Sequence, residues 1–359
     1  MHKRLFIPGP VDVLPQVLEQ MTRPMIGHRT KDASALQGSI ADKMRKLMFT
    51  ENEILLSTSS GSGLMEGAVR SCTARKAAVF SIGAFGDRWY KMAVSNGVPA
   101  DLFESELGQP TTAEQVEAAL STGAYDLITI THNETATGIA NNLEELAPVI
   151  ARYPDVVFCV DSVSSLGGHK IEADRLGIDI LITSTQKCLG LPPGLAICSI
   201  SEKAVKRAEQ VPNRGLYFDL LELYKFVKTK PYQYPSTPAL SLMYALDYQL
   251  DRIMEEGMEQ RFARHSKMAG IVQDWARTNF ALFGNPDYLS QTVTCIDNVS
   301  GVSVSALNGK LADFNYMISG GYGKIKDRTF RIAHMADTTP EQITELLATI
   351  DKVLPELKA

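Results

Sequence analysis

The chain has 359 residues, 45% of them hydrophobic, and a formal net charge of −5, which allows two domains with a sizeable core. The sequence has no basic tract, no membrane-length apolar run, no signal-peptide pattern and no metal-ligand spacing of its cysteines and histidines, so we expect no nucleic-acid, membrane or metal partner. The odd number of five cysteines fits the reducing cytoplasm, where we expect the protein to act.

Up to Ile200, short apolar runs alternate with helical patterns. Residues 1–15 are an extended lead-in rich in proline, and helices are expected near 13–24 and 34–49. Strands are predicted at 53–58, 77–82, 99–103, 126–131, 156–161, 178–182 and 195–200. Helices are predicted at 64–70, 112–121, 142–152 and 201–210, with another after Gly83. Because parallel strands need a crossover between them, this alternation predicts an α/β fold with a mostly parallel sheet between helices.

The pattern changes in the last third of the chain. Residues 211–238 look irregular and rich in tyrosine and proline, as in a subunit contact or the rim of a site. Two long helices, 238–256 and 258–280, are expected to meet near Gly257. After them, strands at 291–297, 313–318 and 328–334 alternate with helices at 301–311 and 340–354. We therefore divide the chain into an N-terminal segment (1–15), a large domain (16–256) and a small C-terminal α+β domain (257–359).

A carboxylate and an amine follow two of the predicted strands. Asp161 ends the apolar run 156–160, and Lys187 follows the run 178–182 after a short polar stretch. Ligands of parallel sheets bind beyond the carboxyl ends of the strands. This pair suits pyridoxal phosphate, because the amine would form an imine with its aldehyde and the carboxylate would keep its pyridine nitrogen protonated. Each residue taken alone also fits an ordinary charged residue in a loop.

Four further features each have two interpretations. Ser60–Ser62 lies between a strand and a helix, as in a phosphate-binding turn, but it also fits a simple helix cap. Phe85 fits either stacking on a flat cofactor ring or core packing. Arg331, on a strand, fits either a clamp for a substrate carboxylate or a salt bridge on an edge strand. His28 and Arg29 fit either an anion-binding pair or solvated side chains.

The chain as a whole resembles the class V aminotransferases of fold type I, a family that depends on pyridoxal phosphate and includes alanine–glyoxylate, serine–pyruvate and phosphoserine aminotransferases. The resemblance runs from Pro8-Gly9-Pro10 to the segment 330–335. Its most specific motifs are Val160-Asp161-Ser162-Val163-Ser164-Ser165-Leu166-Gly167-Gly168 and Thr183-Ser184-Thr185-Gln186-Lys187-Cys188, the second of which is close to the family's S-x-Q-K motif.

The resemblance implies a role for each candidate residue. Lys187 looks like the Schiff-base lysine and Asp161 like the partner of the pyridine nitrogen. Cofactor contacts are implied for Ser60, Gly61 and Ser62 (phosphate), Gln186 (phosphate or ring edge), Thr135 (phenolic oxygen), Phe85 (ring stacking, where relatives often have Trp), and Tyr234 and Thr237 (phosphate, from the neighbouring subunit). Arg331 resembles the arginine that holds the substrate α-carboxylate. The shared Tyr234 and Thr237 imply a homodimer.

The reaction implied is transfer of an amino group from a small L-amino acid to a 2-oxo acid with ping-pong kinetics. His28 and Arg29 resemble a pair that holds the substrate phosphate in phosphoserine aminotransferases, and the basic residues Lys324, Lys326 and Arg328 could add charge there. We therefore expect a slight preference for phosphoserine and 2-oxoglutarate, as in serine biosynthesis. The alternative is serine or alanine as donor with pyruvate or glyoxylate as acceptor.

Two other classes of protein remain as rivals. Cysteine desulfurases share the fold, but they carry His before the lysine, where this chain has Gln186, and a mobile nucleophilic Cys in the small domain. The last cysteine here, Cys295, lies in a strand-like run, where we expect an inert thiol. A non-catalytic scaffold of the same fold is the second rival, and the occupied catalytic positions speak against it.

Overall fold

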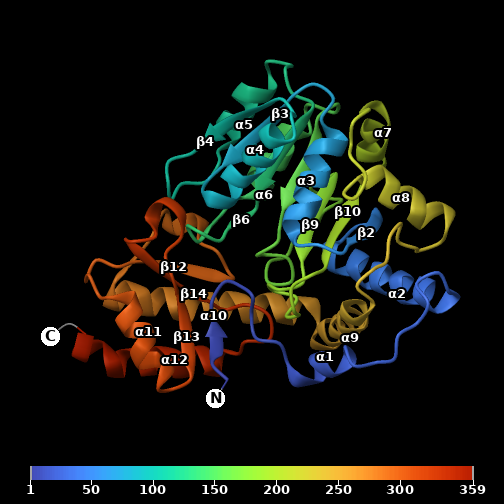
Figure 1. Cartoon of the computed structure of the whole chain (residues 1–359). Helices are drawn as coiled ribbons and strands as arrows, with labels where there is room; N and C mark the ends of the chain where they lie inside the picture. Colours follow the sequence, from blue (N-terminus) through green and yellow to red (C-terminus); the bar gives the residue numbers. More distant parts are fainter. Residues whose placement is uncertain (1, 358–359) are drawn as a thin grey trace.

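The computed structural model describes residues 2–357, which form two large sheets and a separate two-stranded hairpin (Figure 1). The larger sheet has the order β2 (Glu53–Ser57), β10 (Ala196–Ile200), β9 (Ile180–Ser184), β8 (Val157–Asp161), β5 (Leu127–Thr131), β3 (Ala77–Ser81) and β4 (Ala100–Glu104). Strand β10 runs antiparallel to both its neighbours, and all other neighbouring strands of this sheet are parallel. The predicted α/β fold with a mostly parallel sheet is confirmed.

Helices cover both faces of this sheet. One face packs against α2 (Lys31–Met48), α5 (Ala113–Leu120), α6 (Leu143–Ile150) and α9 (Leu240–Glu256), and the other against α3 (Gly61–Cys72), α4 (Ala84–Ser95), α7 (Glu202–Gln210) and α8 (Leu220–Thr229). Along β8, Phe158 and Val160 belong to the first apolar core, while Val157 and Cys159 belong to the second. Every position of this strand is buried, which is why its sequence is apolar without alternation.

The smaller sheet joins the two ends of the chain. Its order is β1 (Arg4–Phe6), β13 (Tyr316–Gly320), β14 (Thr329–Ala333), β12 (Val293–Asp297) and β11 (Ala281–Leu282). Helices α10 (Met258–Asn279), α11 (Val304–Ala312) and α12 (Pro340–Val353) pack on it around a third apolar core. The blue strand β1 therefore lies among the orange C-terminal elements in Figure 1, paired in parallel with β13.

The structure adds several elements to the predicted ones. Helix α8 lies inside the segment 211–238, which we expected to be irregular, so that prediction is wrong for Leu220–Thr229; the Asp219 carboxylate caps the helix by accepting from Leu221 N at 3.0 Å. The very short strands β1, β11 and the hairpin β6 (Asn133–Glu134) and β7 (Ile139–Ala140) were not predicted. Other short elements are α1 (Pro15–Gln20), η1 (Pro286–Tyr288), η2 (Gly323–Ile325) and η3 (Leu354–Leu357).

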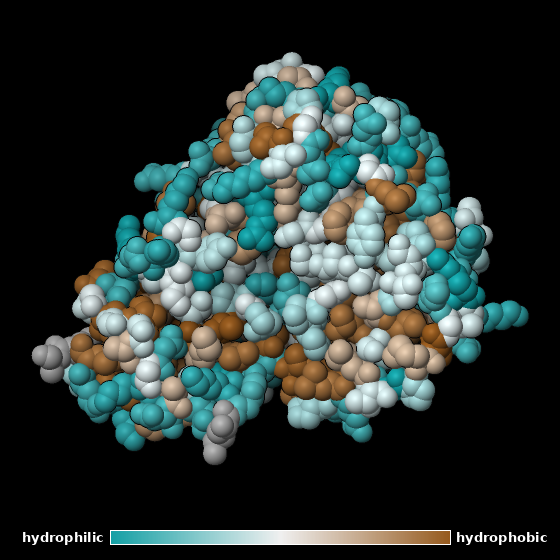
Figure 2. Space-filling model, viewed as in Figure 1, coloured by the Kyte–Doolittle hydropathy of each residue, from teal (hydrophilic) through white to brown (hydrophobic). Residues whose placement is uncertain are grey.

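Within residues 2–357, no helix combines the length and apolarity needed to cross a membrane, and no cluster of three metal-ligating side chains occurs. Figure 2 shows hydrophilic side chains interspersed with smaller apolar patches over the upper part of one face, and larger apolar patches along its lower part with hydrophilic side chains below them. Where the two parts meet, the surface has intermediate hydropathy.

Candidate active site

The loops that follow β8 and β9 form the floor of the candidate site. These strands are parallel, with Asp161 opposite Ile182, so Asp161 and the end of β9 at Ser184 lie at the same edge of the sheet. Lys187 follows Ser184 by three residues in the next loop. The structure therefore delivers both side chains to one edge, as the sequence predicted.

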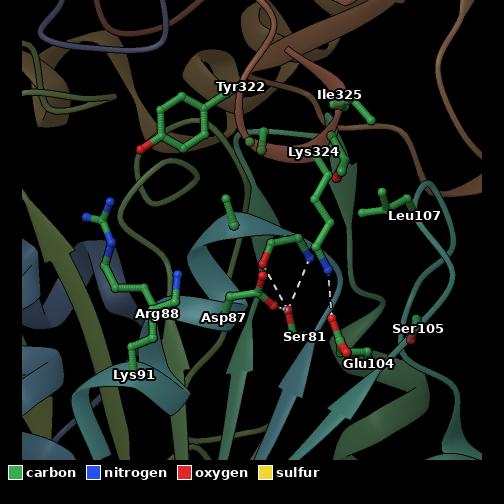
Figure 3. A pocket seen from close by; sticks show the side chains of 15 residues that line it. Ser81, Asp87, Arg88, Lys91, Glu104, Ser105, Leu107, Tyr322, Lys324 and Ile325 are labelled. Atoms are coloured by element: carbon green, nitrogen blue, oxygen red, sulfur yellow. Dashed lines mark hydrogen bonds and ion pairs between the residues drawn. The ribbon is translucent and has the colours of Figure 1, made fainter. Parts of the chain in front are cut away.

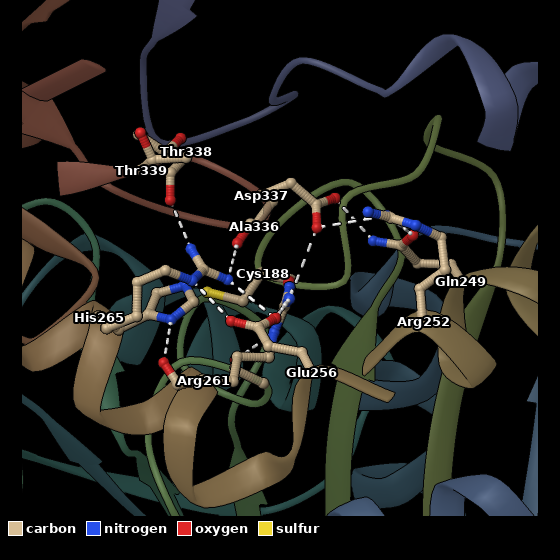
Figure 4. Close-up of polar contacts among 12 residues, drawn as sticks. Cys188, Gln249, Arg252, Glu256, Arg261, His265, Ala336, Asp337, Thr338 and Thr339 are labelled. Atoms are coloured by element: carbon tan, nitrogen blue, oxygen red, sulfur yellow. Dashed lines mark hydrogen bonds and ion pairs between the residues drawn. The ribbon is translucent and has the colours of Figure 1, made fainter. Parts of the chain in front are cut away.

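One buried arginine ties these two loops together (Figure 4). Arg261, on α10 and only 1% exposed, donates from Nε to Gly167 O at 3.0 Å and from Nη2 to Cys188 O at 2.8 Å. Its charge is balanced by Glu256, at 2.7 Å from Nη1. Sequence analysis missed this residue, because nothing local indicates that a helical arginine reaches two distant loops.

The N-terminal segment covers Lys187. The Lys187 Nζ donates a hydrogen bond to Pro8 O, and Val11 N donates to Gln186 O at 3.2 Å. Gly9 has a φ of +96°, and a Cβ there would lie 2.8 Å from Nζ, so the close approach requires glycine. Burial lowers the pKa of Lys187 to about 8, and the charge of Arg331 acts in the same direction. A good share of the amine is therefore neutral, and hence nucleophilic, slightly above neutral pH.

Asp161 is a buried carboxyl group that lacks a full ionic partner. It is 5% exposed, and burial raises its pKa to about 6. The Val163 N–H, which donates to Oδ1 at 2.9 Å, and the charges of Lys187 and Arg88 oppose this shift. A cationic group placed against Asp161 would keep the carboxylate ionised, as a protonated pyridine nitrogen does.

The glycine-containing turn Ser60–Ser62 lies against the same two loops. A Cβ on Gly61, the first residue of α3, would lie 2.6 Å from Val163 Cγ2 and 3.5 Å from Ser184 Oγ. Ser184 Oγ and Gln186 Oε1 are buried, and neither has a hydrogen-bond partner among residues 2–357. A helix N-terminus, a glycine cradle and unpaired polar atoms fit a phosphorylated ligand, so these residues fit pyridoxal phosphate.

A buried glutamate positions Phe85 and the neighbouring segment. Glu134 is fully buried, and its carboxyl oxygens accept from the backbone N–H groups of Phe85 (2.9 Å), Gly86 (3.2 Å) and Ala136 (2.9 Å). Burial raises its pKa to about 7. It caps helix α4 from a distance, since the N-cap residue is Gly83. Sequence analysis missed this role, although an acidic residue in a polar stretch directly after a strand was a signal.

Arg331 lies on β14, which is the central strand of the smaller sheet. The salt bridge on an edge strand is therefore the wrong interpretation, and no carboxylate pairs with Arg331 among the described residues. Its Nε, Nη1 and Nη2 donate to Gly320 O, Thr135 O and Ser319 Oγ, each at 3.0 Å. The guanidinium is buried and anchored, and one N–H on each terminal nitrogen is left for a ligand.

The remaining predicted residues lie on the phosphate side of the site or away from it. Tyr234 is buried, and its hydroxyl accepts from Thr58 N of the same chain at 3.2 Å. Arg29 donates to the Tyr234 carbonyl oxygen and to Pro235 O at 3.0 Å. His28 and Thr237 form no hydrogen bond or ion pair within residues 2–357. In the isolated chain, the structure does not bring His28, Arg29 or Thr237 to Arg331.

A cavity of 570 Å³ opens between the carboxyl ends of β3 and β4 and the segment 322–325 of the smaller domain (Figure 3). Its wall on the smaller sheet includes Tyr322, whose ring stacks on Phe85 with centroids 5.7 Å apart and lies 5.5 Å from the Arg331 guanidinium carbon. Lys324 crosses the cavity to Glu104 at 3.0 Å. Tyr322 therefore links the wall of this cavity to both Phe85 and Arg331.

The chain is similar to known aminotransferases over most of its length. The family model for class V aminotransferases matches residues 19–321. The chain is 37% identical to an uncharacterised aminotransferase of Methanocaldococcus jannaschii, covering 99% of this chain and 94% of the relative. It is 31% identical to a serine–glyoxylate aminotransferase of Methylorubrum extorquens, covering 94% and 87% respectively. The crystal structure of an alanine–glyoxylate aminotransferase from Nostoc matches with a TM-score of 0.92 at 26% identity, covering 99% of this chain and 96% of that one.

The comparisons correct our substrate expectation. A phosphoserine aminotransferase structure from Cytophaga hutchinsonii is 22% identical and a cysteine desulfurase structure from Thermococcus onnurineus is 15% identical, so both share the fold alone. The preference for phosphoserine is not supported, and the alternative with serine or alanine as donor fits the relatives better. Burial also raises the pKa of the Cys295 thiol to about 12, which agrees with the inert thiol that we expected.

Proposed function

The chain belongs to the class V aminotransferases and depends on pyridoxal phosphate, and from this premise we propose that it transfers the amino group of serine or alanine to glyoxylate or pyruvate. We propose further that Lys187, Asp161 and Arg331 are the residues that act on the cofactor and the substrate. The relatives that act on serine and alanine with glyoxylate support the substrate class.

The bound cofactor supplies an aldehyde and an electron-withdrawing ring, which acidifies the Cα–H bond of an amino acid joined to it. In our proposal Lys187 would hold the cofactor through its aldehyde, and its amine, when free, would be the group that takes up or releases the proton at the substrate Cα. Its lowered pKa of about 8 suits this work near neutral pH. Asp161 would face the ring nitrogen, and its carboxylate would favour the protonated form of that nitrogen.

The substrate carboxylate would be held by Arg331. Its two remaining N–H groups sit on the two terminal nitrogens, as bidentate binding of a carboxylate requires. Because Nε, Nη1 and Nη2 are each fixed to the protein, the fork is preorganised, so little side-chain entropy is lost on binding.

A donor with a small uncharged side chain is favoured over phosphoserine because several of the basic side chains already bind groups of the protein. Of the basic residues that we expected to receive a phosphate, Lys324 pairs with Glu104 and Arg328 with Asp297. Arg29 is bound to backbone carbonyl oxygens. A substrate phosphate would have to compete with these contacts to reach Lys324, Arg328 or Arg29, whereas the hydroxyl of serine or the methyl group of alanine needs no cation.

Single half-reactions test the donor. The enzyme loaded with pyridoxal phosphate is mixed with serine, alanine, aspartate or phosphoserine, and the loss of the visible cofactor band is followed by stopped flow. We expect serine and alanine to react at least roughly 10-fold faster than phosphoserine. A faster reaction with phosphoserine would contradict the proposal. The converted enzyme should then regain its band with glyoxylate or pyruvate, as a ping-pong reaction requires.

We also propose that the enzyme is a homodimer in the cytoplasm, with each site completed by the second copy. Leu216 is 83% exposed and Tyr217 is 46% exposed, although both are large and apolar. The Tyr217 hydroxyl donates to Thr58 O at 3.3 Å, so this exposed segment borders the phosphate turn. Leu216→Asp should shift the sedimentation coefficient from dimer to monomer and weaken cofactor binding. An unchanged dimer would remove this segment from the interface.

A further inference from the structure

The cofactor phosphate lacks a counter-charge in the set of residues so far assigned to it. Ser60, Gly61, Ser62, Gln186 and the Tyr234–Thr237 segment offer hydroxyls, an amide and backbone N–H groups, and all of them are uncharged. A phosphate monoester carries a charge of roughly −1.5 to −2 at neutral pH. The N-terminus of helix α3 provides the equivalent of only about half a positive charge. A nearby cation would therefore add substantially to phosphate binding.

Arg88 lies beside this turn. It belongs to helix α4, which packs against α3, and its Nη1 donates to Ser62 Oγ at 3.3 Å. Its guanidinium carbon lies 4.8 Å from the centroid of the Phe85 ring. The same guanidinium thus touches the aromatic side chain expected to stack on the cofactor ring and a serine expected to bind the phosphate.

The charge of Arg88 acts on the buried carboxyl group of Asp161, but the two groups are not within ion-pair distance. No carboxylate forms an ion pair with it in the part of the chain that the structure describes. The neighbouring Asp87 accepts a hydrogen bond from Ser81 Oγ at 2.6 Å, and Glu104 is paired with Lys324. Figure 3 shows the Arg88 guanidinium at the side of the cavity away from that pair. A half-buried guanidinium with one long hydrogen bond to a neutral hydroxyl has N–H groups available for an anion.

We propose that Arg88 is a binding residue for the cofactor phosphate and supplies its counter-charge next to Ser62. This inference depends on the cofactor assignment but not on the choice of donor. A guanidinium suits the task because it stays charged and its planar fork matches phosphate oxygens. Arg88 also fixes the turn through Ser62, so that the phosphate meets a site whose donors are already in place.

Titration of the apoenzyme with two ligands tests the proposal. Arg88→Gln should weaken the binding of pyridoxal phosphate by roughly 30- to 100-fold, as measured by the visible band and by quenching of protein fluorescence. The binding of pyridoxal, which has the same aldehyde and ring without the phosphate, should change by less than about 3-fold. Arg88→Lys should recover part of the lost affinity, because it keeps the charge without the fork.

Lys91→Gln is the matched control, since Lys91 lies one turn further along the same helix, lines the same cavity and forms no ion pair within residues 2–357. It should leave both affinities unchanged. In ³¹P spectra of the bound cofactor, the phosphate of the wild-type enzyme should stay dianionic to a lower pH than that of Arg88→Gln.

Each other outcome overturns the proposal. An equal loss for pyridoxal phosphate and pyridoxal would make Arg88 structural, and no loss for either would remove it from the site. Unchanged cofactor affinity with a higher KM for aspartate but not for alanine would assign Arg88 to a substrate side chain. Should Arg88→Gln fail to fold, the comparison of Arg88→Lys with the wild type decides, because loss of the fork should still weaken the phosphate-bearing ligand selectively. Failure of the wild-type protein itself to bind pyridoxal phosphate would instead refute the cofactor assignment.

Discussion

Replacement of Arg331 by Gln should remove the hydrogen bonds that we expect between the guanidinium and the substrate carboxylate. The guanidinium has five N–H groups, of which three are fixed to Gly320, Thr135 and Ser319. The two that remain would each form a charge-assisted hydrogen bond, and such bonds contribute roughly 1.5–3 kcal/mol each. Allowing for desolvation of the ligand, we expect a loss of about 3 kcal/mol, which corresponds to roughly 100-fold weaker binding of the amino acid.

The assay is the dependence of the half-reaction rate on alanine concentration, which yields the dissociation constant of the donor. Arg328→Gln is the control, because Arg328 lies three residues before Arg331 on the chain and its exposed guanidinium pairs with Asp297. Propylamine, which has no carboxylate, should react equally with the wild type and with Arg331→Gln. Unchanged affinity for alanine, or an equal loss for propylamine, would refute the clamp.

Three other changes test the rest of the site. Asp161→Asn should keep the cofactor bound but slow the half-reaction by at least roughly 100-fold, measured by stopped flow, because the ring nitrogen loses its charged partner. Gly9→Ala should weaken cofactor attachment at Lys187, whereas Gly97→Ala, with a φ of +71° and open space around its Cβ, should not; equal effects would exclude the steric explanation. Glu134→Gln tests linkage: the folded carboxyl has a pKa of about 7 against an ordinary 4.5, so the folded state holds the proton more tightly. Urea titrations should therefore show the wild type losing about 3 kcal/mol relative to Glu134→Gln as the pH rises from about 4.5 to 7, and parallel curves would contradict this.

The fold, and the placement of Asp161 and Lys187 at one edge of the sheet, could be predicted from the sequence for physical reasons. Buried parallel strands are apolar at every position, so the runs ending at Asp161 and near Lys187 stand out. Their shared edge follows from the topology alone. The position of Arg331 between apolar neighbours on a strand left two interpretations, and only the strand order, which places β14 in the middle of its sheet, excludes the salt bridge on an edge strand.

What the sequence could not supply are contacts between distant segments. Arg261 reaches Gly167 and Cys188 from a helical position that follows them by 94 and 73 residues. Glu134 caps helix α4 from the segment that follows the neighbouring strand β5. Lys324 and Arg328 belong to a basic cluster in the sequence, but in the fold they pair with Glu104 and Asp297. This pairing weakens the case for a phosphorylated substrate. Helix α8 was not predicted, because the segment around it in the sequence is rich in tyrosine and proline.

The central claim is that Lys187 holds the cofactor aldehyde, and covalent trapping tests it most directly. The enzyme loaded with pyridoxal phosphate is reduced with borohydride, digested and mapped by mass spectrometry. We predict a single pyridoxyl-phosphate adduct on the peptide containing Lys187 and none in Lys187→Ala. An adduct on a different lysine, or an unmodified Lys187 in an enzyme that still transfers amino groups, would contradict it.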